Sequence, residues 1–160
     1  MAVDMMLKID SVTGESVITG HENEIDLLAW SWGMRQSGSM HVATGGGSGK
    51  VDVHDINITK YLDKSTPVIT QYCCSGKHFR NAKLTVRKAG GSPVDYLVIE
   101  MENVLISSVN TGGSSSEDRL TENVALNFSK FKVVYKPQNP DGSAGADVSM
   151  GFDIAKNTLS

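Results

Sequence analysis

The sequence predicts a mainly β fold, either a sandwich or a barrel of antiparallel strands. Segments with strand character recur at short intervals and are separated by Gly, Asn, Asp and Ser turns, which is typical of these two architectures. Only one segment carries the signals of a helix. A chain of 160 residues is the size of one domain and can bury a sizeable core. We therefore expect a single domain over residues 1–160.

Segments with strand character cover much of the chain. In one of them Phe131, Val133 and Tyr135 alternate with lysines, which indicates one packed face and one solvated face. The predicted strands are Val3–Ile9, Glu24–Gly33, Val51–Thr59, Lys83–Ala89, Val94–Met101, Val104–Val109, Asn123–Phe128, Phe131–Lys136 and Ser149–Ile154.

One short helix is predicted after the strand that ends at Thr59. Ser65 or Thr66 suits the N-cap, Pro67 suits the first turn and Gly76 suits the C-terminal end. The apolar residues that share one face of this helix are Val68, Ile69, Tyr72 and Cys73.

Two segments are predicted to be loops because they lack apolar periodicity and are rich in glycine or proline. They are Ser37–Lys50 and Pro137–Ala146. A loop of about fourteen residues is longer than the usual connection in a compact domain. We therefore expect Ser37–Lys50 to have a function or to contact another subunit.

Two predicted strands are apolar on both faces. In Glu24–Gly33, Trp30 and Trp32 lie on one face, whereas Ile25 and Leu27 lie on the other. The strand predicted at 94–101 has the same two-sided character. Because a large exposed apolar patch is costly in a soluble monomer, this pattern favours oligomerisation. The alternative, that the helix covers one of these strands, stays open.

Several long motifs carry a resemblance to a known protein family. They are Ile25–Lys50, Gly76–Phe79, Lys83–Gly91 and Glu117–Asn123. Together they closely resemble Hcp, the haemolysin co-regulated protein of bacterial type VI secretion, and the resemblance extends from Met1 to at least Tyr135. It implies a β-barrel of two packed antiparallel sheets with one short α-helix and an extended glycine-rich loop. It also implies hexameric rings that stack into a tube, are secreted, and can hold cargo in the lumen.

Candidate residues for subunit contact and stacking follow from the resemblance and from the large aromatic residues. Trp30 and Trp32 come first because interface energy concentrates in a few buried aromatic and Arg anchors; the alternative is that both are simply core residues. The resemblance makes Gly38–Lys50 an arm that reaches neighbouring subunits and rings. Glu117, Asp118 and Arg119 are either a surface ion-pair cluster or part of a ring interface. Because exposed ion pairs contribute only about 0–1 kcal/mol each, these charges would set register rather than strength. The candidates are Trp30, Trp32, Arg35, Gly45, Gly46, Gly47, Lys50, Glu117, Asp118 and Arg119.

The polar turn that contains Ser114, Ser115 and Ser116 has two interpretations. It is either a solvated hairpin loop or a surface that faces the lumen of the ring. Short uncharged side chains permit weak contact with varied cargo, which makes these serines the candidates for effector contact. The resemblance also implies other partners, namely a VgrG-type spike, contractile sheath proteins and small secreted effectors.

Charge and hydropathy argue against nucleic acid and membrane as partners. With 15 basic and 18 acidic residues and a formal charge of -3, the chain lacks the clustered positive charge that either partner needs. Met1–Asp10 does not have the pattern of a secretory signal peptide, and no apolar run reaches about 18 residues. We expect a protein made in the bacterial cytoplasm and, from the resemblance, exported without a cleaved signal.

No cofactor, metal site or enzymatic activity is predicted. The segment Gly45–Lys50 fails the phosphate-binding pattern, because Thr44 stands at the first glycine position and Val51 follows the lysine. The four histidines lie far apart in the sequence. The adjacent Cys73 and Cys74 fit neither a redox motif nor a zinc site, so we expect buried or half-buried free thiols.

Two other classes of function remain as alternatives. A monomeric β-barrel that binds a small ligand or a carbohydrate would use Trp30 and Trp32 as an aromatic platform in a pocket. An enzyme would require histidines and carboxylates to converge in the fold, with perturbed titration.

Overall fold

The computed structural model describes residues 3–38, 49–88 and 93–160. These residues form one helix, α1 (Thr66–Ser75), and twelve strands. The first six strands are β1 (Val3–Ile9), β2 (Ile25–Asp26), β3 (Ala29–Ser31), β4 (Met34–Arg35), β5 (Asp52–Val53) and β6 (Ile56–Tyr61). The others are β7 (His78–Lys88), β8 (Val94–Gly112), β9 (Thr121–Asn127), β10 (Lys130–Tyr135), β11 (Val148–Asp153) and β12 (Thr158–Leu159).

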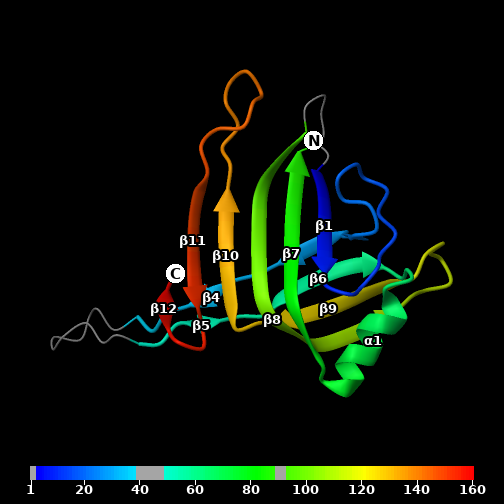
Figure 1. Cartoon of the computed structure of the whole chain (residues 1–160). Coiled ribbons are helices and arrows are strands. Elements are labelled where there is room, and N and C mark those ends of the chain that lie inside the picture. The colour runs from blue at the N-terminus through cyan, green and yellow to red at the C-terminus, as the bar shows by residue number, and fades with distance from the viewer. Residues whose placement is uncertain (1–2, 39–48, 89–92) are drawn as a thin grey trace.

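The antiparallel strands form two layers that pack face to face. The first layer has the order β12-β11-β10-β8-β7-β1-β2, and the second continues from β8 through β9 and β6 to β3. In Figure 1 the strands of the first layer run vertically, and β6 and β9 cross behind them. The predicted mainly β fold with packed antiparallel sheets and one helix is confirmed. The strand order ends at β12 and β2 within the described residues, so the layers do not close into a barrel.

Strand β8 belongs to both layers because it bends in the middle. Its first part pairs with β10 and β7, and its last part pairs with β9. At the bend Asn103 has a φ of 54°, and its side-chain amide donates a hydrogen bond of 2.9 Å to Ser129. Asparagine tolerates this left-handed conformation better than most residues. The two strands predicted at 94–101 and 104–109 are therefore one continuous strand.

The chain changes layer a second time between Leu27 and Leu28. The amide of Leu27 donates to the carbonyl of Met5 in the first layer, and the amide of Leu28 donates to Thr59 in the second. The single strand predicted over 24–33 is therefore wrong, because β2 pairs with β1 and β3 pairs with β6. The change of layer lets Ile25 and Trp30 pack against the same core.

The helix begins and ends where its local signals predict. Ser65 is its N-cap, Pro67 lies in its first turn, and Gly76 ends it with a φ of 66°. Ile69 is buried in the core between the layers, whereas Val68, Tyr72 and Cys73 are half-buried at its margin. Cys73 fits the predicted half-buried thiol, but Cys74 is exposed, and both are free.

A buried ion pair joins α1 to the second layer. The Lys60 side chain is fully buried, and its ammonium lies 2.7 Å from Glu122 Oε1 and 3.0 Å from Asp63 Oδ1. It also donates to Thr66 Oγ1 at 3.1 Å. Glu122 is fully buried too, and its Oε2 has no hydrogen-bond partner in the structure. The pair therefore fixes the start of α1 against β6 and β9.

A methyl group at Gly14 is expected to destabilise the fold. A Cβ there would lie 2.7 Å from the carbonyl carbon of Glu24 and 2.9 Å from Cα of Ile25. These are backbone atoms and cannot rotate away, so the backbone at the start of β2 must shift. We expect Gly14→Ala to lower the free energy of unfolding by about 1–3 kcal/mol. Urea denaturation measures this, and Gly38→Ala is the control because nothing lies within 4 Å of a Cβ at Gly38.

Candidate functional site

The second layer consists of β3, β6, β9 and the last part of β8. Among their described residues, all side chains that face outward are uncharged. The register places Ser31 beside Asn57, and Thr59 beside Asn123. Thr59 donates a hydrogen bond of 2.7 Å to Asn123 Oδ1. We call this surface the polar face. Its residues are Ala29, Ser31, Asn57, Thr59, Tyr61, Ser108, Asn110, Thr121, Asn123 and Ala125.

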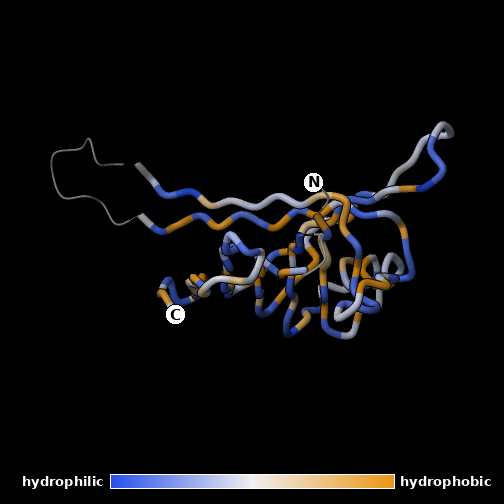
Figure 2. The backbone as a smooth tube through the Cα atoms, turned by 90° about the horizontal axis from the view of Figure 1, so that it is seen from above, coloured by the Kyte–Doolittle hydropathy of each residue, from blue (hydrophilic) through white to orange (hydrophobic). Residues whose placement is uncertain are grey.

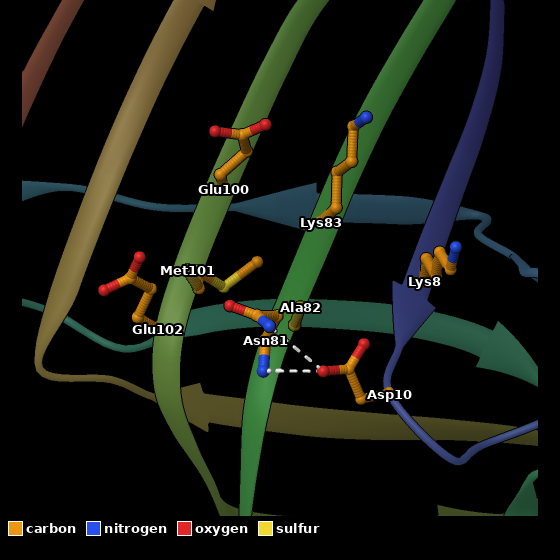
Figure 3. Close-up of a pocket in the computed structure, with 8 residues that line it drawn as sticks. All are labelled: Lys8, Asp10, Asn81, Ala82, Lys83, Glu100, Met101 and Glu102. Carbon is orange, nitrogen blue, oxygen red and sulfur yellow. Dashed lines mark hydrogen bonds between the residues drawn. The ribbon is translucent and has the colours of Figure 1, made fainter.

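The outward side of the first layer carries many charged residues, which an uncharged row of Met6, Thr85, Val98 and Val134 interrupts. The register aligns Lys8, Lys83, Glu100 and Lys132 in one row across β1, β7, β8 and β10. Figure 3 shows three of these side chains projecting beside a groove of about 310 Å³. At one end of the groove Asp10 accepts a hydrogen bond of 3.1 Å from the Asn81 amide group. We call this surface the charged face.

A two-stranded arm extends from the second layer. It consists of residues 32–38 and 49–55, and β4 pairs with β5 in the register Met34 with Val53 and Arg35 with Asp52. Figure 2 shows the two segments running side by side away from the body of the molecule. Arg35 and Lys50 are exposed on this arm. The candidates Gly45, Gly46 and Gly47 lie outside the described residues.

Both tryptophans lie at the base of the arm and pack against the core. Trp32 meets Phe131 edge to face, with ring centroids 4.8 Å apart and an interplanar angle of 83°. Its indole nitrogen donates a hydrogen bond of 3.0 Å to the carbonyl of His54. Trp30 is half-buried against the same core. Their role in a subunit interface stays a prediction.

Apolar side chains continue along the core-facing sides of both layers beyond this aromatic contact. Met34 points to the same side as Val53, which packs against the core, yet Met34 is 46% exposed. In the first layer Val133 and Phe152 pack against the core, while their register partners Met150 and Leu159 are exposed. We call this surface the apolar margin. It comprises Met34, Tyr135, Val148, Met150 and Leu159, which are 43% to 77% exposed.

The serine turn between β8 and β9 is exposed along its whole length. Ser114 and Ser116 share a hydrogen bond of 2.8 Å, and Ser115 lies exposed between them. Arg119 stacks on the ring of Tyr61, with its guanidinium carbon 3.8 Å from the ring centroid. Among the ion pairs of the described residues none involves Glu117, Asp118 or Arg119. Arg119 therefore holds the turn by a cation–π contact.

The loop at residues 13–24 is fastened across β1 by a polar cluster. Arg87 Nε donates a hydrogen bond of 2.7 Å to Asp95, and an Arg87 terminal nitrogen donates to the carbonyl of Thr19. The buried His21 ring lies 2.8 Å from Glu24 and 3.3 Å from Asp95. Partial burial alone would raise the pKa of Asp95, but the hydrogen bond and charge of Arg87, together with those of His21, lower it below its usual value.

Acid is expected to release this loop. The folded-state pKa of Asp95 is depressed, so its pairing stabilises the fold above the unfolded pKa of about 3.9, and the contribution is lost as the pH falls through the folded pKa. We expect Asp95→Asn to lower the free energy of unfolding by about 1 kcal/mol or less at pH 7. Urea denaturation of both proteins at several pH values checks this. A difference that persists unchanged below the folded pKa would contradict the assignment.

The described histidines do not converge on one site. His21 belongs to the loop cluster, His54 lies 3.8 Å from Asp52 on the arm, and His78 is exposed on β7. In the parts of the chain that the structure describes, no group of three His, Cys, Asp or Glu side chains is placed to hold a metal ion. No helix there is long and apolar enough to span a membrane. His41 lies outside the described residues.

Sequence reasoning missed the polar face, the charged face and the apolar margin. Each consists of side chains from several strands, so it becomes visible only when the register is known. A signal was nevertheless present in the sequence. The polar residues of the 57–59 and 107–111 segments are asparagine, serine and threonine, whereas those of 80–88 and 130–136 include many lysines and arginines.

Comparisons with known proteins agree with this architecture. Residues 6–135 match the model of the family described as "Type VI secretion system effector, Hcp". The chain is 58% identical to the protein hcp1 of Pseudomonas aeruginosa, with 98% of each chain covered. It is similar in structure to Hcp1 from Salmonella typhimurium, with a TM-score of 0.83, 34% identity and both chains fully covered. A type VI secretion system effector from Yersinia pestis gives a TM-score of 0.78 at 35% identity, covering 94% of this chain and 99% of the other. The chain belongs to the Hcp family of type VI secretion proteins.

Proposed function

We propose that this chain is a structural subunit of the inner tube of a type VI secretion apparatus. Its copies form hexameric rings, the rings stack, and the assembly is secreted with small effectors in its lumen. The apolar margin carries this proposal. Its five side chains extend the core-facing sides of both layers into solvent, which is costly for a soluble monomer and is relieved when another subunit covers them.

The arm supports contact between subunits and between rings. It projects well beyond the body in Figure 2, and it exposes Arg35 and Lys50 for polar contacts with a neighbouring copy. The aromatic contact of Trp32 with Phe131 fixes the base of the arm. A projection of this kind buries surface only when a second molecule lies against it.

The polar face supports a role as the wall of the lumen. Its asparagine, serine and threonine side chains offer hydrogen bonds without a fixed charge, so they suit weak contact with varied cargo. Ser114, Ser115 and Ser116 extend this uncharged surface at the end of β8. The charged face lies on the opposite side of the two layers, so in such a ring it faces away from the lumen.

The remaining partners follow from the role as a tube subunit. A VgrG-type spike caps the tube, contractile sheath proteins surround it, and small secreted effectors travel inside. The protein acts as one domain over residues 1–160 and performs no reaction. It is made in the bacterial cytoplasm and leaves through the apparatus itself, without a cleaved signal peptide, to the extracellular space or into target cells.

Light scattering after size exclusion, with negative-stain images of the same peak, tests the proposal. The expected result is a mass six times the 17.2 kDa of one chain, together with ring-shaped particles. A compact monomer at micromolar concentration would contradict the tube role. It would favour the monomeric ligand-binding alternative, which a screen of small ligands and carbohydrates by tryptophan fluorescence would then examine.

A further inference from the structure

The most exposed large apolar residue in the described parts of the chain lies on a well-fastened loop. Val17 is 88% exposed. The loop around it is held by backbone hydrogen bonds of 2.9 Å from Ser16 to Glu24 and from Asn23 to Ser16. Arg87 holds the carbonyl of Thr19 at 3.1 Å. An apolar side chain that is presented in a fixed position is pre-organised to bind, because little conformational entropy is lost on contact.

Val17 and most of the apolar margin lie at opposite edges of the first layer. The loop at 13–24 adjoins β1 and β2 at one end of the strand order, whereas β11 and β12 form the other end. In Figure 1 the loop lies to the right of β1, and β11 and β12 lie on the left. In a ring with head-to-tail contacts, opposite edges of neighbouring subunits meet.

The charges at the two edges are also complementary. The loop exposes Glu15 and Glu22. At the other edge Lys156 is exposed in the turn between β11 and β12 and is in no ion pair among the described residues, while the acidic Asp147 there lies 3.8 Å from Lys136. Complementary rim charges guide encounter and fix the register of two surfaces.

We infer that the apolar margin of each subunit receives the Val17 loop of the next copy of this chain. Val17 contacts the side chains of Val148, Met150 and Leu159, and the cluster of His21, Arg87 and Asp95 positions the loop for that contact. This inference rests on the proposed function, because it assigns two surfaces to the ring interface that the tube role requires.

Substitution of Val17 by aspartate tests the inference on the full-length protein. Burial of a valine side chain is worth about a ten- to hundredfold change in association at each interface, and a buried unpaired carboxylate adds to the loss. On dilution, we expect Val17→Asp rings to dissociate at a protein concentration at least about tenfold higher than the concentration at which wild-type rings dissociate. Light scattering over a dilution series measures both. Circular dichroism of the subunit stays unchanged, because Val17 makes little contact within it.

Leu120→Asp is the matched control. Leu120 is also exposed, at 49%, but lies on the serine turn rather than at either of these two edges. Rings of Leu120→Asp are expected to dissociate at the same protein concentration as wild-type rings. Val17→Asp rings as stable as those of Leu120→Asp would overturn the inference.

Cysteine crosslinking gives a second readout that does not depend on stability. In a chain with Cys73→Ser and Cys74→Ser, the pair Val17→Cys and Met150→Cys should yield covalent multimers on mild oxidation, whereas each single cysteine should not. If the wild type forms rings but the double-cysteine variant gives no covalent multimers, the inference is overturned and the tube role stays intact. A monomeric wild-type protein would overturn both.

Discussion

Replacement of Lys60 by methionine is expected to lower the free energy of unfolding by about 3–5 kcal/mol. Methionine fills much of the same volume but removes the ammonium that pairs with Glu122 Oε1 at 2.7 Å. Glu122 is fully buried, and its second oxygen already lacks a partner. The variant therefore leaves a buried carboxylate without a positive charge, with only the Thr66 hydroxyl donating to it at 3.2 Å. Urea denaturation followed by far-UV circular dichroism measures the loss.

Two further variants separate the buried charge from general effects of the substitution. Lys64→Met changes an exposed lysine on the connection between β6 and α1, and we expect it to alter the free energy of unfolding by no more than about 0.5 kcal/mol. Lys60→Met combined with Glu122→Leu removes both charges, so it should recover part of the stability that the single variant loses. Equal losses in Lys60→Met and Lys64→Met would contradict the assignment.

Local signals predicted the helix and the main strands because their causes lie within a few residues. Pro67 and Gly76 mark the ends of α1 in the sequence as they do in the fold. The alternation from Phe131 to Tyr135 likewise predicts β10, since each side chain of a strand takes its side from the pleat. Such features need no knowledge of which strand lies next to which.

Features that depend on distant partners could not be predicted. The two apolar sets of residues 25–32 indicated a strand with two buried faces. In the fold the chain changes layer between Leu27 and Leu28 and thereby turns Ile25 and Trp30 toward one core. The hydrogen bonds that cause this change go to Met5 and Thr59, more than twenty residues away in each case. Periodicity alone cannot distinguish such a change of layer from a second covered face.

Only part of the candidate site could be predicted, because the rest depends on strands that are distant in sequence. The described ends of the predicted loop, residues 37–38 and 49–50, belong to a projecting arm, and Arg35 and Lys50 lie exposed on it. The residues of the apolar margin were missed although Val148, Met150 and Phe152 alternate along one strand. The alternation does not say which strands lie beside it, and the common side of Tyr135, Val148, Met150 and Leu159 follows only from the pairing of β11 with β10 and β12. The stacking of Arg119 on Tyr61 was also missed, since the two residues are far apart in sequence.

Replacement of Trp32 by alanine is expected to lower the free energy of unfolding by about 2–4 kcal/mol and to weaken ring assembly. The indole joins the two layers at the base of the arm through its edge-to-face contact with Phe131, and its nitrogen donates to the carbonyl of His54. Loss of the ring leaves a cavity beside the apolar margin, so the arm no longer holds a fixed direction relative to the first layer. Urea denaturation, read from the fluorescence of the remaining Trp30, measures the stability, and light scattering measures the assembly.

Trp32→Phe separates the two contributions of this side chain. Phenylalanine keeps an aromatic ring against Phe131 but loses the hydrogen bond to His54, so we expect a loss of only about 1 kcal/mol. If the direction of the arm depends on the aromatic contact, Trp32→Phe rings should assemble nearly as well as the wild type, whereas Trp32→Ala rings should not. If both variants assemble as well as the wild type, the pairing of Met34 with Val53 in β4 and β5 is sufficient to direct the arm.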